Sequence, residues 1–104
     1  MDIMEKIKQQ VEGAPIVLYI KGTPQFPQCG FSARVVEALK VVGAEYNAYN
    51  VLQDAELMQN LPRYADWPTF PQLYINGELV GGCDITMDLL QQGELEKMVK
   101  ATQA

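Results

Sequence analysis

The chain has 104 residues and a formal net charge of −5, with 13 acidic residues, eight basic residues and no histidine. Its length fits a single domain, residues 1–104, and the lack of histidine excludes histidine metal ligands and histidine general bases. Lysine and arginine form no cluster, and no run approaches about 18 apolar residues, so we expect no nucleic acid and no membrane among the partners.

The amino-terminal segment is predicted to be an amphipathic helix. Ile3, Ile7 and Val11 recur at helical spacing among charged residues, and Gly13 ends the pattern. This segment lacks the continuous apolar stretch of a secretory signal. Two cysteines without such a signal are typical of a reducing compartment, so we expect a cytoplasmic protein.

A cysteine at the start of a predicted helix is the main chemical feature. The apolar run 16–20 indicates a buried central strand that leads to Lys21, and the helix after Cys29 ends at Gly43. A thiol at a helix N-terminus lies near free backbone N–H groups and the positive end of the dipole. Cys29 is therefore predicted to be a nucleophile or a metal ligand.

The residue three positions after Cys29 is Ser32, where thioredoxin-like redox proteins carry a second cysteine. A hydroxyl cannot resolve a mixed disulfide. The alternative is a buried, inert cysteine. The polar segment 21–28, rich in proline and glycine, favours an exposed loop instead.

The rest of the chain continues an alternation of helices and strands. We predict a strand at 46–51, a helix from an Asp54 cap to Pro62, strands 72–75 and 78–80 around the turn Asn76-Gly77, a helix from an Asp84 cap through Leu90, and a last helix after Gly93. This is the element order of an α/β thioredoxin-like fold, with a four-stranded mixed sheet flanked by helices.

Over essentially its whole length the chain resembles a monothiol glutaredoxin of the Cys-Gly-Phe-Ser type. Three blocks in order carry the resemblance: Lys21-Gly22-Thr23-Pro24 with Pro27 and Cys29-Gly30-Phe31-Ser32, Trp67-Pro68-Thr69 with Pro71-Gln72-Leu73-Tyr74, and Gly77-Glu78 with Gly81-Gly82-Cys83-Asp84. The glutaredoxin fold and a glutathione site are what this resemblance implies.

The resemblance places glutathione in a groove between the Cys29 loop, the Pro71 turn and the Gly82 turn. It assigns Lys21 and Arg63 to the glycine carboxylate, a charge-assisted contact. Arg34 could play a part similar to that of Arg63, or merely face solvent. Lys21 could likewise be a solvated charge at the end of a strand.

Two further turns belong to the implied glutathione site. The resemblance makes the Phe70–Pro71 peptide bond cis and pairs the backbone of Phe70 with the cysteinyl part of glutathione. It also assigns Gly82, Cys83 and Asp84 to the γ-glutamyl end, where N–H groups at a helix start would hold the carboxylate and Asp84 the amine. The alternative for Asp84 is a simple helix cap.

The resemblance leaves two functions open. In the first, Cys29 thiolates of two subunits and two glutathione thiols ligate a 2Fe-2S cluster in a homodimer, which delivers the cluster to iron-sulfur acceptor proteins. In the second, Cys29 is the nucleophile of a glutathione-dependent oxidoreductase that reduces protein-glutathione mixed disulfides. BolA-like proteins are expected as partners of the cluster carrier.

Loop length favours the cluster carrier. Cys29 follows Lys21 by eight positions. In oxidoreductase-type glutaredoxins, which resemble this site, the loop is about five residues shorter. Cys83 has two interpretations: a small turn residue without chemistry, or a disulfide partner of Cys29 under oxidation.

Overall fold

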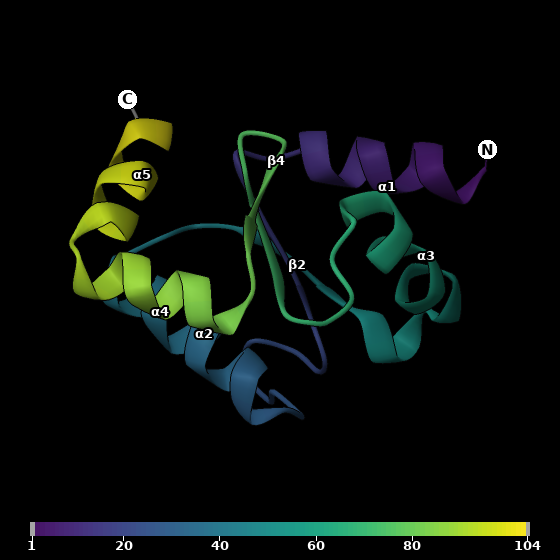
Figure 1. Cartoon of the computed structure of the whole chain (residues 1–104), viewed down its shortest axis with the longest axis horizontal. Helices are drawn as coiled ribbons and strands as arrows, with labels where there is room; N and C mark the ends of the chain where they lie inside the picture. Colours follow the sequence, from purple (N-terminus) through teal and green to yellow (C-terminus); the bar gives the residue numbers. More distant parts are fainter. Residues whose placement is uncertain (1, 104) are drawn as a thin grey trace.

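The structure is a computed structural model that describes residues 2–103, so Met1 and Ala104 of the predicted domain lie outside the described residues. Helices and strands alternate as the sequence predicts (Figure 1). The elements are α1 (Ile3–Glu12), β1 (Ile16–Ile20), α2 (Gly30–Val41), β2 (Asn47–Asn50), the 3-10 helix η1 (Val51–Gln53), α3 (Ala55–Ala65), β3 (Gln72–Ile75), β4 (Glu78–Gly81), α4 (Cys83–Gln91) and α5 (Glu94–Thr102).

The four strands form one mixed sheet in the order β2-β1-β3-β4. β1 pairs in parallel with β2, while β3 is antiparallel to both β1 and β4. Asn76 and Gly77 connect β3 to β4 with positive φ angles of 53° and 80°, as a tight hairpin turn requires. The predicted thioredoxin-like fold with a four-stranded mixed sheet is confirmed.

Helices cover both faces of the sheet, with α2, α4 and α5 on one side and α1 and α3 on the other (Figure 1). Every residue of β1 is buried. Leu18 and Ile20 belong to the first apolar layer, and Val17 and Tyr19 belong to the second, because successive side chains of a strand point to opposite faces. This buried strand fixes the position of Lys21 at its carboxyl end.

Two predicted helix boundaries are wrong. Asp84 is not the N-cap of α4, because β4 continues to Gly81 and the chain turns at Gly82, so the helix begins at Cys83 with Asp84 in its first turn. α3 continues past Pro62 to Ala65 and ends where Asp66 adopts a left-handed conformation. The missing N–H of a proline costs the helix a hydrogen bond without preventing its continuation here.

Within residues 2–103, no helix is both long enough and apolar enough to cross a lipid bilayer. The longest stretch of helix is the 12-residue α2, which carries charged residues along its exposed side.

Candidate functional site

Cys29 is the N-cap residue of α2, as its place in the sequence predicts. Its thiol makes no capping hydrogen bond. The backbone N–H of Ser32 nevertheless favours the charged thiolate and is the main cause that lowers the pKa of Cys29. The N–H of Phe31 and the positive charge of Lys21 act in the same direction. The thiol is therefore activated by the start of the helix.

The loop before Cys29 is held by its own hydrogen bonds. The N–H of Gln28 donates to the carbonyl of Lys21 at 2.8 Å, which closes the base of the loop. Thr23 and Phe26 exchange backbone hydrogen bonds of 3.3 and 3.1 Å at its tip. The long segment between β1 and α2 is thus an ordered turn that places Cys29 beside the end of β1.

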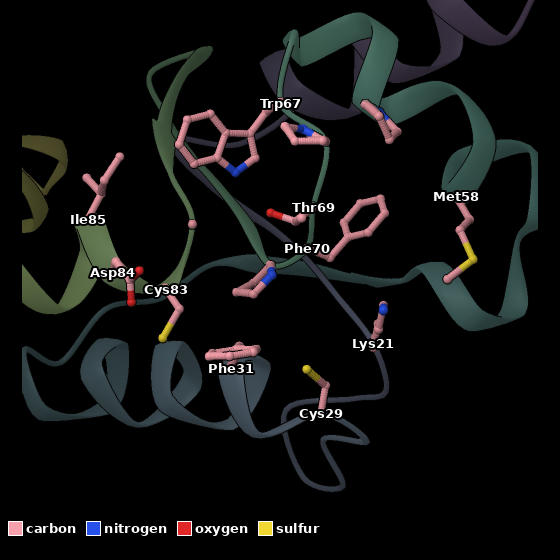
Figure 2. A pocket seen from close by; sticks show the side chains of 14 residues that line it. Lys21, Cys29, Phe31, Met58, Trp67, Thr69, Phe70, Cys83, Asp84 and Ile85 are labelled. Atoms are coloured by element: carbon pink, nitrogen blue, oxygen red, sulfur yellow. The ribbon is translucent and has the colours of Figure 1, made fainter.

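Cys29 opens onto a cavity of about 800 Å³. Figure 2 shows the Cys29 sulfur directed into this cavity, with Phe31 beside it and the Thr69–Phe70 loop opposite. Cys83 and Asp84 at the start of α4 form a third side. Seven of the eight predicted site residues line it: Lys21, Cys29, Phe70, Pro71, Gly82, Cys83 and Asp84.

Arg63, the eighth, is not among the residues that line the cavity. Its side chain is exposed and donates a hydrogen bond to Oδ1 of Asn60 at 3.3 Å. The α3 residues that reach the cavity are Met58 and Pro62. Lys21 does line the cavity, and none of the salt bridges within residues 2–103 involves it. Its ammonium group is thus available to an anion.

The turn before β3 has the geometry that the resemblance implies. The Phe70–Pro71 peptide bond is cis. Gly82 lies close behind this turn: a Cβ atom on Gly82 would be 3.2 Å from the Pro71 carbonyl oxygen and 3.3 Å from Nε1 of Trp67. Both distances are tighter than usual for a Cβ atom, so a side chain at this position would push α4 and the turn slightly apart.

The two cysteines differ in their electrostatic surroundings. Cys83 is 7% exposed, and burial is the main cause that raises the pKa of its thiol. The nearby guanidinium of Arg34 acts in the opposite direction. Both cysteines are free, and the predicted disulfide between Cys29 and Cys83 stays a prediction.

Seven residues that line the cavity were not among the predicted site residues: Phe31, Met58, Pro62, Trp67, Pro68, Thr69 and Ile85. Phe31 and Ile85 are large apolar side chains that are 57% and 37% exposed. Phe31 follows Cys29 by two positions, and this closeness was an available signal. Met58 carried none, because only the packing of α3 determines which of its residues faces the cavity.

The glutaredoxin family model matches residues 16–80, which include the Cys29 loop and the turn at Pro71. This chain belongs to the glutaredoxin family. The chain is also 50% identical over 101 residues to glutaredoxin 4 of Escherichia coli strain K12, a match that covers 97% of this chain and 88% of that relative.

Two solved structures of glutaredoxins are similar to this one. Reduced poplar apo GrxS14 has a TM-score of 0.81 and 45% sequence identity, and the match covers 95% of this chain and 91% of that one. A buckwheat glutaredoxin-glutathione complex has a TM-score of 0.84 and 27% identity, covering 97% of this chain and 90% of that one. The fold of this glutaredoxin is therefore shared with a protein that binds glutathione.

Proposed function

We propose that this glutaredoxin is a monothiol protein that carries a 2Fe-2S cluster, held in a homodimer by Cys29 of two chains and the thiols of two glutathione molecules. The observation that carries this proposal is the activated thiol of Cys29 directed into a cavity of about 800 Å³. Such a volume is within the range of small-molecule sites and leaves room for a tripeptide beside the sulfur.

The polar groups of the cavity support glutathione as the ligand. Glutathione carries two carboxylates and an amine, and Lys21 supplies a cation that forms no salt bridge within residues 2–103. At the opposite side, α4 begins at Cys83 with no side-chain cap, so its first N–H groups are available to a carboxylate. Asp84 lies beside them as a partner for the amine. Arg63, the second cation assigned to the glycine carboxylate by the resemblance, does not line the cavity and donates to Asn60.

The sulfur count supports a dimer for the cluster. A 2Fe-2S cluster takes four ligands. No group of three or more histidine, cysteine or acidic side chains within residues 2–103 is placed to hold a metal. In the proposed dimer each chain contributes Cys29, and two glutathione thiols complete the set of four. The cluster is the cargo that iron-sulfur acceptor proteins receive.

BolA-like proteins are the second kind of partner that we propose. The chain contains no histidine. A partner that offers an imidazole could replace one sulfur ligand and raise the reduction potential of the cluster, as nitrogen ligation does in such centres. The cytoplasm, where thiols stay reduced, is the proposed location.

Anaerobic reconstitution with iron, sulfide and glutathione tests the proposal. We expect a visible charge-transfer spectrum that requires glutathione and coincides with a molecular mass twice that of the monomer. Cys29→Ser should abolish the spectrum, while Cys83→Ser should retain it and so serves as the matched control. A colourless monomer that rapidly reduces a protein-glutathione mixed disulfide would instead identify an oxidoreductase and overturn the proposal.

A further inference from the structure

A buried glutamine lies directly behind the cavity wall. Gln72, the first residue of β3, is fully buried, although it is polar and does not line the cavity. Its amide Nε2 donates to the backbone carbonyls of Trp67 at 3.1 Å and Thr69 at 3.3 Å. Its Oε1 accepts a hydrogen bond from the hydroxyl of Tyr74 at 3.1 Å. Burying an amide is unfavourable unless such partners are present.

The partners of Gln72 allow only one orientation of its amide. The carbonyls of Trp67 and Thr69 can accept hydrogen bonds but cannot donate them, so the NH₂ group must face them. The oxygen then faces the Tyr74 hydroxyl, which can donate. Gln72 and Tyr74 point to the same face of the sheet because they are two positions apart on one strand. The Tyr74 hydroxyl in the core thus fixes the orientation of the Gln72 amide, and the NH₂ group of that amide holds the loop at Trp67 and Thr69.

The loop that Gln72 holds is the cavity wall. Residues 67–70 all line the cavity, and they connect α3 to β3 without regular secondary structure. The N–H of Trp67 is bonded to the carbonyl of Pro62, at the end of α3. Between that point and β3, the amide of Gln72 provides the two side-chain hydrogen bonds that hold the loop. We propose that Gln72 is a positioning residue that fixes this wall for glutathione.

This inference rests on the proposed function, because it takes glutathione as the ligand. Gln72 is covered by the wall and acts only through Trp67 and Thr69. Loss of its two donors would leave two carbonyl groups unpaired and let the loop adopt more conformations. Glutathione would then have to order the loop on binding, which weakens its affinity.

The test uses Gln72→Met, which keeps the length of the side chain and removes its hydrogen bonds. Gln10→Met is the matched control, because Gln10 also accepts a hydrogen bond from a tyrosine hydroxyl, that of Tyr19 at 2.9 Å, but neither lines the cavity nor bonds to the loop. Reduced glutathione is titrated into each full-length protein, and its binding is measured by equilibrium dialysis. We expect Gln72→Met to weaken binding about tenfold and Gln10→Met to change it less than twofold.

A second readout is independent of glutathione. Trp67 is the chain's single tryptophan, so its fluorescence reports on the wall alone. We expect acrylamide to quench this emission more strongly in Gln72→Met than in the wild type and in Gln10→Met. A purely structural role of Gln72 would lower the melting temperature without changing either quenching or affinity at a temperature where the variant is folded.

The outcomes separate the two proposals. If the wild type binds no glutathione, the proposed function fails. The quenching measurement alone then still tests whether Gln72 orders the loop of residues 67–70. If the wild type binds glutathione and Gln72→Met equals it in both affinity and quenching, the role of Gln72 is overturned. Should Gln72→Met fail to fold, Gln72→Asn replaces it, because the shorter amide stays uncharged but cannot reach the loop carbonyls and the Tyr74 hydroxyl together. Wild-type affinity in that variant would equally overturn the inference.

Discussion

The hydroxyl oxygen of Ser32 accepts a hydrogen bond from the backbone N–H of Lys21 at 3.2 Å. Ser32 is fully buried in the first turn of α2, and Lys21 follows directly after β1. The bond therefore ties the end of the central strand to the helix that Cys29 caps. Ser32, which cannot resolve a mixed disulfide, instead keeps two of the groups that line the cavity, Lys21 and Cys29, in a fixed relation.

Ser32→Ala removes that tie. The N–H of Lys21 loses its partner in a partly buried place, so we expect the free energy of unfolding to fall by about 1–2 kcal/mol. The hydroxyl of Ser32 also helps to lower the pKa of Cys29, so that pKa should rise. Urea unfolding measures the first effect, and thiolate absorbance followed against pH measures the second.

Thr23→Ala is the matched control for Ser32→Ala. Thr23 Oγ1 also accepts a backbone hydrogen bond, from Phe26 at 3.1 Å, but at an exposed place on the same loop. We expect its loss to change the free energy of unfolding by less than about 0.5 kcal/mol. Equal effects of the two substitutions would mean that the Ser32 bond has no special part in the site.

The two cysteines should react with iodoacetamide in a fixed order. The pKa of Cys29 is lowered and that of Cys83 is raised, and only the thiolate reacts. As the pH rises from 6, the alkylation rate at Cys29 should increase first, and it should level off at a pH below the pKa of an ordinary thiol. The alkylation rate at Cys83 should still be rising at a pH above that ordinary pKa. Mass spectrometry of Cys29→Ser and Cys83→Ser proteins follows each thiol separately, and faster labelling of Cys83 at pH 7 would contradict the prediction.

Gly22→Ala should disrupt the loop before Cys29. Gly22 has a φ angle of +103°, and an added Cβ would lie 2.6 Å from the Phe26 carbonyl oxygen and 2.6 Å from the Gln28 nitrogen. Both are backbone atoms of the same loop, so the loop itself must move. We expect a loss of about 2–3 kcal/mol in the free energy of unfolding and an altered rate of Cys29 alkylation.

Gly30→Ala is the control on the other side of Cys29. Nothing lies within 4 Å of a Cβ placed on Gly30, the first residue of α2. Alanine favours a helix more than glycine does, so this protein should be as stable as the wild type or up to about 1 kcal/mol more stable. Thermal unfolding measures the stability of Gly22→Ala and Gly30→Ala. Comparable losses of stability in the two variants would refute the steric argument.

Lys21→Ala should weaken glutathione binding. One charge-assisted contact at a half-exposed site contributes roughly 1 kcal/mol, so we expect a loss of about three- to tenfold, larger at low salt, where screening is weakest. Lys40→Ala makes the same change of net charge at the last turn of α2, away from Cys29, and should have little effect. Titration calorimetry at two salt concentrations measures both. If the two variants bind alike, the carboxylate is held elsewhere.

Local patterns were sufficient for much of the fold. The apolar run 16–20, the turn at Asn76-Gly77 and the helix capped by Asp54 all appear where the sequence places them, because each depends on neighbouring residues. The start of α4 was not predictable in this way. Its boundary depends on how far β4 follows β3 and on the packing of Gly82 against Trp67, and neither is a local property.

For the site, the sequence by itself determined which chemistry is available: an activated thiol at a helix start, one cation after the central strand, and glycines where α4 begins. Only the tertiary structure decided which side chains share the cavity. It brings Met58 to the wall and leaves Arg63 bonded to Asn60, and it places Gln72 behind residues 67–70. The reason is physical: a residue's type and its neighbours fix its reactivity, whereas the packing of helices on the sheet fixes the direction in which it points.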